Sequence, residues 1–262
     1  MNNCDQARHE RLREDFIARR GYWNDEWEVL LGLDPDYMEA YTDLSSYASE
    51  HGSLSPKLRE FIYIATCATV THLFASGMRQ HMKNAFALGA TAEELMALFA
   101  LVSGVGIHTF YLTMSSLEEV SPGATSVIRE TRAKQAKGPI PAAADVVEKH
   151  RRIYGGLSPE VKVAIQADPA FYDRFLNLAE VSLGRPNLIP TKDAHLIMMA
   201  VHACATGLLA PGVRMHAQAA LANGATPVEI ADVCEQITGM SVHTLSVGVP
   251  VLVSEMAARE SE

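Results

Sequence analysis

The sequence predicts an all-α protein built from two tandem copies of one helical unit, and three observations support this. Residues 54–109 align with residues 189–244 without a gap, at an offset of 135, with 19 identities in 56 positions. Helix-capping residues recur at matching places in the two copies. No run of residues alternates between apolar and polar side chains as a strand would. A match of this length does not arise by chance, so we expect an internal duplication.

The duplication also divides the chain. Asp34-Pro, upstream of the aligned core, is echoed by Asp168-Pro with a shift of one residue. Between the copies lie Ser-Pro-Gly, a charged run and Gly-Pro-Ile-Pro, which is the composition of a linker. The sequence therefore predicts a first domain over 1–120, a linker over 121–145 and a second domain over 146–262.

We expect five or six helices in each copy. Ser55 followed by Pro supplies an N-cap and a proline at the first helical position. Gly89 suits the end of a helix, and Thr91 with Glu94 forms a capping box for the next one, a device that recurs at Thr226. The helices expected from these signals cover 56–73, 76–88, 92–103 and 107–119, with the last repeated at 242–256.

Composition excludes several classes of partner. The formal net charge of -9 disfavours binding to nucleic acid or to an anionic membrane surface. The first 20 residues are charged and show no signal-peptide pattern, and polar residues or glycines interrupt the apolar runs before the roughly 20 residues that span a bilayer. The four cysteines form no C-x-x-C pair and fit a reducing cytoplasm, where we expect the protein to act. They are Cys4, Cys67, Cys204 and Cys234.

Polar residues retained in both copies mark the candidate site. They are Gly77, Arg79 and His81 in the first copy, and Gly212, Arg214 and His216 in the second. Each set lies in the first turns of a helix, whose N-terminus favours a bound anion. Arginine adds a planar fork for a carboxylate, and histidine moves protons near neutral pH. The alternative is a buried histidine and a surface arginine that are both held by packing.

Further polar residues are candidates for the same site. His108 and His243, each followed by threonine, begin the last helix of each copy and either face the site or act as caps. Glu60 has His195 as its counterpart, and both side chains are able to act as acid or base. No metal-ligand spacing recurs in the two copies, so we expect no metal site.

The residues quoted so far resemble the carboxymuconolactone decarboxylase family, of alkyl hydroperoxidase D-like fold, over about 55 residues of each copy. The resemblance rests on Leu-Arg-Glu60 and on Arg79-x-His81 followed by Gly-Ala-Thr and Glu, repeated from Arg214 onward. One branch of the family is a dithiol peroxidase, with cysteines seven and four residues before the histidine. Those positions here are Phe74 and Gly77, and Leu209 and Gly212, so peroxidase activity is not expected.

The other branch of the family acts without a cofactor on an unsaturated lactone carboxylate of aromatic-acid degradation. The resemblance therefore implies a cofactor-independent decarboxylase for a small lactone or β-keto acid, because the substrate's own carbonyl accepts the electrons. We expect Arg79 and Arg214 to orient the acid, and His81 and His216 to donate the proton. The supporting groups are Glu60 and His195 as further acid–base residues, and His108, His243, Gly77 and Gly212 as substrate contacts.

Two alternatives remain open. A retro-aldol or lactone-opening step uses the same groups, and a non-catalytic helical binding protein keeps the fold without the chemistry. Arg79, His81 and His108 pointing into one closed pocket would favour an enzyme, and separate contacts would favour the binding protein. Glu60 lies 21 residues before His81, two more than in the family, and its replacement by His195 suggests that the two sites are not equivalent.

The duplication also predicts an assembly. The resembled family packs single-domain chains into dimers and the dimers into a hexameric ring. Fusion of two copies makes one of these contacts intramolecular and raises its effective concentration. We therefore expect a homotrimer that rebuilds the six-unit ring, with a lone pseudo-dimer as the alternative. In both, a pseudo-two-fold axis relates the two copies, and matching helices face each other.

Overall fold

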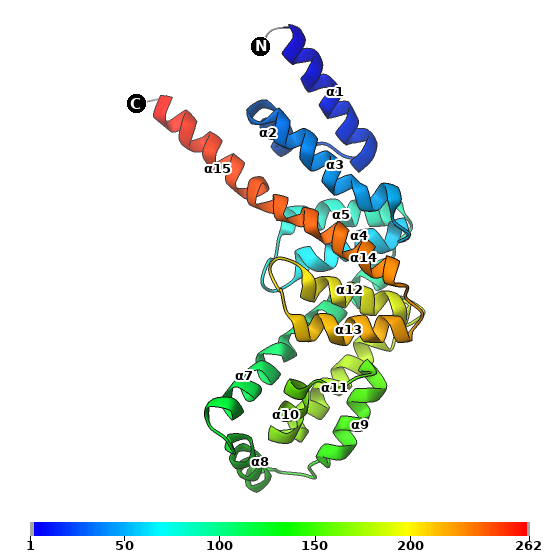
Figure 1. The fold of residues 1–262 in the computed structure, drawn as a ribbon, viewed down its shortest axis with the longest axis vertical. Coiled ribbons are helices and arrows are strands. Elements are labelled where there is room, and N and C mark those ends of the chain that lie inside the picture. Colours follow the sequence, from blue (N-terminus) through cyan, green and yellow to red (C-terminus); the bar gives the residue numbers. More distant parts are fainter. Residues whose placement is uncertain (1–2, 261–262) are drawn as a thin grey trace. The chain divides into compact units, whose positions relative to one another are not determined.

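The structure, a computed structural model, describes residues 3–260, and within that range every regular element is a helix (Figure 1). The all-α prediction is confirmed. The first copy contains α1 (Asn3–Arg20), α2 (Asp25–Leu33), α3 (Pro35–His51), α4 (Pro56–Ala68), α5 (Ala75–Ala87), α6 (Ala92–Ser103), the 3-10 helix η1 (Gly104–Gly106) and α7 (Ile107–Val120). Helix α8 (Ala124–Gln135) lies within the expected linker.

The second copy repeats this order of elements. It contains α9 (Ala143–Tyr154), α10 (Pro159–Ala167), α11 (Pro169–Leu183), α12 (Thr191–Ala203), α13 (Ala210–Ala222), α14 (Pro227–Thr238), the 3-10 helix η2 (Gly239–Val242) and α15 (His243–Glu260). Each copy thus has seven α-helices among the described residues, not five or six. The excess comes from elements such as α1, whose residues are mostly polar and show no apolar stripe.

The expected caps are confirmed. The Thr91 hydroxyl accepts from the Glu94 amide at 3.2 Å while the Glu94 carboxylate accepts from the Thr91 amide at 2.8 Å. Thr226 and Glu229 repeat the exchange at 3.1 and 2.7 Å. Gly89 has a φ of +80°, the left-handed conformation that ends a helix at lowest cost. The first of these helices ends at Ala68, earlier than expected, because a turn intervenes before α5.

The chain forms two compact units whose limits differ from those of the copies. The first comprises Met1–Leu54 and Ala231–Glu262, and so combines α1, α2 and α3 with η2, α15 and most of α14. Its core contains Phe16 and Trp27, whose ring centroids lie 5.0 Å apart, together with Leu31 and Met38. Within this unit α15, from the second copy, packs on α2, from the first.

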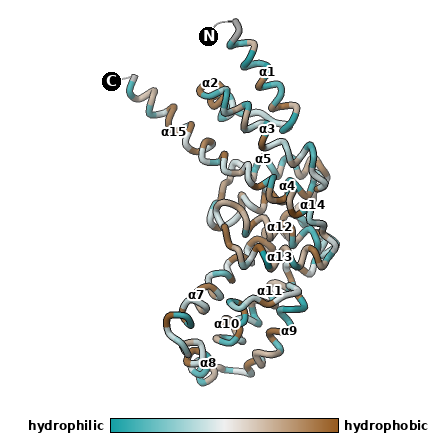
Figure 2. Tube along the Cα trace, viewed as in Figure 1, coloured by the Kyte–Doolittle hydropathy of each residue, from teal (hydrophilic) through white to brown (hydrophobic). Residues whose placement is uncertain are grey.

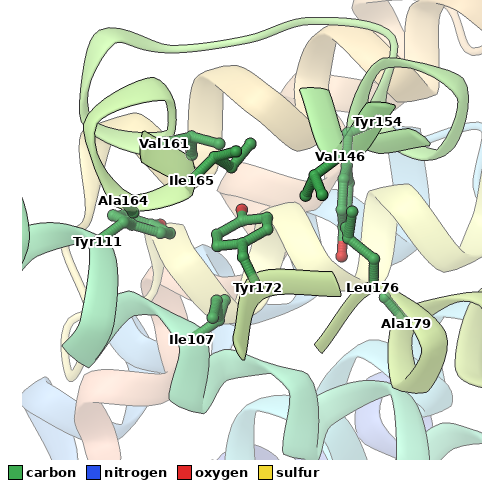
Figure 3. Close-up of a cluster of buried hydrophobic side chains, with 10 residues drawn as sticks. All are labelled: Ile107, Tyr111, Val146, Tyr154, Val161, Ala164, Ile165, Tyr172, Leu176 and Ala179. Atoms are coloured by element: carbon green, nitrogen blue, oxygen red, sulfur yellow. The ribbon is translucent and has the colours of Figure 1, made fainter. Parts of the chain in front are cut away.

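The second compact unit is Ser55–Ile230. Helix α12 is largely hydrophobic (Figure 2) and packs against both α13 and α4, its equivalent in the first copy. Helix α7, from the first copy, packs on α10, from the second. Figure 3 shows the resulting core, in which Tyr111 of α7 lies among side chains of α9, α10 and α11, including Tyr154 and Tyr172. Within each unit, therefore, the last helix of one copy packs on the early helices of the other.

Two stretches are long and apolar enough, by length and composition alone, to cross a membrane, contrary to the expectation from sequence. They are Ala92–Val120 and Pro227–Arg259. In the most apolar 18 residues of each stretch, 44% and 17% of the residues, respectively, are buried. The helices run almost without interruption through η1 and η2, so the glycines there do not divide them. A core helix passes the same test, and Leu95, Leu98 and Leu101 of the first stretch are buried.

Candidate functional site

A carboxylate and an imidazole form a hydrogen-bonded pair in the first copy. Glu60 projects from α4 and His81 from α5, helices that pack against each other on either side of the turn at 69–74. The His81 Nδ1 lies 2.8 Å from the Glu60 Oε2, and the two side chains are 8% and 16% exposed. The Asn84 amide donates to the other carboxylate oxygen at 3.4 Å. The Tyr63 ring stacks on the imidazole with centroids 4.3 Å apart.

This arrangement suits proton transfer. The Glu60 carboxylate accepts a hydrogen bond from Nδ1, which fixes the ring orientation and leaves Nε2 outside this hydrogen bond. An imidazole that is hydrogen-bonded to a carboxylate is an arrangement that enzymes use in general acid–base catalysis. Expected from sequence only as a supporting group, Glu60 is the direct partner of the histidine.

The second copy has two imidazoles at the equivalent positions. His195 of α12 and His216 of α13 are 1% and 3% exposed, and their Nδ1 atoms lie 3.0 Å apart. One Nδ1 donates and the other accepts, which requires the accepting ring to be neutral. Burial lowers the pKa of His195 to about 4. Burial, together with neighbouring histidines, also lowers the pKa of His216 well below its usual value. Both rings are therefore neutral near pH 7.

The imidazole pair belongs to a larger buried cluster. His108 reaches it from α7, and its Nε2 lies 3.1 Å from the Nε2 of His202 on α12. The Tyr111 hydroxyl contacts the Nδ1 of His108. Burial and the neighbouring His202 lower the pKa of His108 to about 3, and burial lowers that of His202 to about 4.

A cavity of about 20 Å³, room for about one water molecule, borders the cluster. His108, Tyr154, His202 and His216 line it together with apolar side chains. His150, also of α9, lies next to Tyr154, and the centroids of the two rings are 4.8 Å apart. Burial lowers the pKa of His150 to about 4. His150, His195, His202 and His216 of the second copy are thus buried, with little room for water beside them.

Sequence reasoning missed His202, His150 and Tyr154. Retention in both copies does not mark His202, because Cys67 stands at its position in the first copy. A usable signal was present, since His202 follows His195 by seven residues, two helical turns, and so shares its face of α12. No comparable pattern marks α9, whose histidine joins the cluster only through tertiary packing.

The arginines do not join either pair. Arg79 and Arg214 are exposed, whereas His81 and His216, two residues further along the same helices, are buried. Residues two apart on a helix do not face each other, so this separation follows from helix geometry. His108 contacts His202 and Tyr111, not His81. Arg79, His81 and His108 therefore make separate contacts.

The retained glycines leave room for these side chains. A Cβ at Gly77 would lie 2.6 Å from the Phe74 ring and 2.9 Å from the Cys67 sulfur. A Cβ at Gly212 would lie 2.7 Å from the His202 ring and 2.9 Å from His108. Close packing thus accounts for both glycines. His243 begins α15 in the other compact unit and is half-buried.

Within residues 3–260 no group of three or more His, Cys, Asp or Glu side chains is placed to hold a metal ion. Cys67 and Cys204 are buried free thiols, and Cys234 is exposed. Burial, with a smaller contribution from Cys204, raises the pKa of Cys67 to about 12. At neutral pH this side chain is a thiol, not the reactive thiolate.

The fold and the two histidine sites define a tandem all-helical protein with unlike halves. The family model of the carboxymuconolactone decarboxylase family matches residues 35–105 and 169–241, just over half of the chain and once in each copy. The chain belongs to this family, and the resemblance noted from sequence is confirmed. Residues of both pairs fall within the matched segments.

One solved structure extends the match to almost the whole chain. It is a crystal structure at 1.70 Å from Burkholderia xenovorans LB400, described as a candidate gamma-carboxymuconolactone decarboxylase subunit. The two chains are 28% identical, with a TM-score of 0.81, over 97% of this chain and 98% of that one. A search of curated proteins found no match.

Proposed function

We propose that the protein is a cofactor-independent carboxy-lyase for a small lactone or β-keto carboxylic acid, with the Glu60–His81 pair as its proton-transfer centre. The observation that carries the proposal is the 2.8 Å hydrogen bond between the His81 Nδ1 and the Glu60 carboxylate. Family membership supports it, as does the similarity to the Burkholderia protein described as a decarboxylase subunit.

The proposed reaction needs only acid–base groups. The bond between the substrate's α-carbon and its carboxylate breaks, carbon dioxide leaves, and the electron pair moves into the adjacent carbonyl or lactone as an enolate. His81 then gives a proton from Nε2 to the carbon, while the Glu60 carboxylate holds the ring in place through Nδ1. Solvent returns a proton to the imidazole and closes the cycle.

We propose that the second copy does not turn over substrate. Its imidazoles are paired with each other, neutral and buried, so neither holds the proton that the last step requires. Arg79 acts in this proposal through its charge on the exposed side of α5, where it attracts acidic substrates without bonding to the reacting atoms.

A specific observation favours a second candidate, a non-catalytic helical binding protein. Arg79, His81 and His108 make separate contacts instead of lining one pocket, as a protein that kept the fold without the chemistry would allow. A direct assay separates the two candidates.

The assay follows carbon dioxide release from a panel of lactone and β-keto carboxylates incubated with the purified protein. The proposal expects release from at least one panel member, and a loss of about 10–100-fold in kcat for Glu60→Gln, which keeps the shape but removes the charge. Glu148→Gln is the matched control, because Glu148 is an exposed carboxylate on α9. Binding of panel members without release would favour the binding protein.

A further inference from the structure

The junction between the two copies contains a cavity much larger than the one beside the histidine cluster. Its volume is about 810 Å³, within the range of small-molecule sites. It is open to solvent and is lined by helix α8, the connection at 136–142 and the first two turns of α11. All three lie in the second compact unit. No residue of the Glu60–His81 pair or of the histidine cluster lines it.

Cationic side chains surround this junction cavity, although the chain carries a net charge of -9. They are Arg129, Arg132, Lys137 and Arg174. The acidic lining residues are Glu130 and Asp168. Asp168 is already engaged, since its carboxylate caps the Phe171 amide at 2.9 Å and lies 3.7 Å from the Arg132 guanidinium.

Three of the cations remain available to a ligand. Among residues 3–260, Arg129, Lys137 and Arg174 form no ion pair within the 4.0 Å that defines one. Arg174 is nonetheless held in place, because its guanidinium donates to the Ala170 carbonyl at 2.9 Å, beside the cavity. The four cationic lining residues outnumber the two acidic ones, and such an excess of positive charge attracts anions.

Apolar side chains form the other part of the lining of the junction cavity. Phe171, 47% exposed, is held against Phe110 of α7 with ring centroids 4.6 Å apart, so its position is fixed by packing. Ile140, Pro141 and Pro169 add further apolar surface. A fixed aromatic ring beside guanidinium groups suits a ligand with an apolar body and an anionic head.

The first copy shows that these charges are particular to the junction. Asp34 and Pro35 match Asp168 and Pro169, but Asp36 stands where the second copy has Ala170. Similarly, Ala40 in the first copy stands where the second has Arg174. The same helix start has thus changed from acidic to basic only where α8 and the connection cover it.

We infer that the junction cavity is a binding site for an amphipathic organic anion, a carboxylate, sulfonate or phosphate ester carried on an aromatic or acyl body. The Arg129, Lys137 and Arg174 side chains bind the anionic group, and Phe171 with the prolines receives the apolar body. The site is separate from the proposed proton-transfer centre and does not depend on decarboxylase activity.

The test is a fluorescence titration with 8-anilinonaphthalene-1-sulfonate, an aromatic sulfonate. We expect saturable binding by the wild-type chain, and binding at least about 10-fold weaker after Arg129→Gln with Arg174→Gln. A control with Lys162→Gln and Arg259→Gln removes two exposed cations elsewhere and should bind like wild type. The uncharged analogue N-phenyl-1-naphthylamine, which lacks the sulfonate, should bind wild type at least about 10-fold more weakly than the sulfonate does.

Three results would overturn the inference. The first is the absence of saturable sulfonate binding to wild type. The second is equal affinity of the cavity variant and the control variant, which would place the dye on another apolar surface. The third is equal affinity for the charged and uncharged dyes. Circular dichroism and thermal melting verify that both variants are folded, which is expected because all four substituted side chains are exposed.

Discussion

The two copies share the same local helical fold, but the hydrogen-bond partner of their retained histidine differs. In the first, an imidazole bonds to a carboxylate, and in the second, an imidazole bonds to an imidazole. One substitution, glutamate at 60 against histidine at 195, separates the two. The histidine that both copies retain thus meets a different hydrogen-bond partner in each copy, and only in the second copy is that partner another buried imidazole.

Burial amplifies the difference. In the second copy the His202 ring lies 5.1 Å from that of His216, between ring centroids, and His108 of the first copy contacts His202 in turn. A protonated ring there would lie beside other rings in a poorly hydrated interior, which is unfavourable. In the first copy the position of His202 is taken by Cys67, an uncharged thiol.

The largest expected effect is on stability at mildly acid pH. Five buried histidines of the second compact unit, His108, His150, His195, His202 and His216, have lowered pKa values in the fold. Unfolded, they would titrate near 6.5, so the unfolded chain binds more protons between pH 6.5 and 4. The free energy of unfolding therefore falls as pH falls through that window, by up to about 1.4 kcal/mol per histidine per pH unit.

Urea unfolding at pH 7.5, 6.5, 5.5 and 5.0 measures this dependence. His216→Gln should reduce the slope by about one proton, whereas His51→Gln, on the exposed end of α3, should leave it unchanged. A flat profile between pH 6.5 and 5.0 would show that the cluster tolerates charge, and the contrast between the copies would fail.

The next effect is on turnover. His81→Ala should lower kcat by roughly 10²–10⁴-fold, because it removes the proposed general acid. His216→Ala should lower kcat by less than about 10-fold per folded molecule, although it destabilises the chain by leaving a cavity. Carbon dioxide release, normalised to the folded fraction from circular dichroism, is the measurement. Equal losses in the two variants would mean that both copies react.

A smaller effect is expected on the pKa of His216 when the carboxylate partner found in the first copy is introduced into the second. His195→Glu should raise the pKa of His216 above its wild-type value, because a carboxylate within hydrogen-bonding distance favours the imidazolium. The His216 ring proton signals, followed by NMR against pH, report the change. His195→Gln, which is neutral, is the control, and an equal pKa in the two variants would show that burial alone sets the titration of His216.

The smallest effect concerns the thiols. Replacing all four cysteines should leave kcat within about 2-fold, since Cys67 is a buried thiol and neither copy has a dithiol before its histidine. The same carbon dioxide assay applies, with thermal melting to verify folding. A folded cysteine-free variant without turnover would contradict the proposed proton-transfer mechanism.

Much of this fold could be predicted from the sequence because it depends on short-range sequence features. The duplication, the capping box at Thr91 and the glycine that ends α5 are short-range features, and all are present. Helix α1 escaped prediction because a charged helix on a surface needs no apolar stripe, and α2 and α3 supply its packing.

The site was only partly predictable for the same reason. Glu60 and His81 lie within one copy, and retention of the histidine in both copies pointed to them. The contact of His108 with His202 joins one copy to the other, and no spacing within a copy indicates it. Similarly, Arg79 looked like a partner of His81 in sequence, but helix geometry points it the opposite way.

The packing of α15 on α2 has a consequence for synthesis of the chain. Residues up to Leu54 leave the ribosome before Ser55–Ile230, yet their compact unit also requires the segment from Ala231 onward, which is made after it. At about 5–20 residues per second, the intervening segment takes roughly 10–35 s to be made. The unit containing Ser55–Ile230 has its complete sequence before the N-terminal helices have theirs. Trp27 and its neighbours therefore lack their final packing partners until α15 has been synthesised.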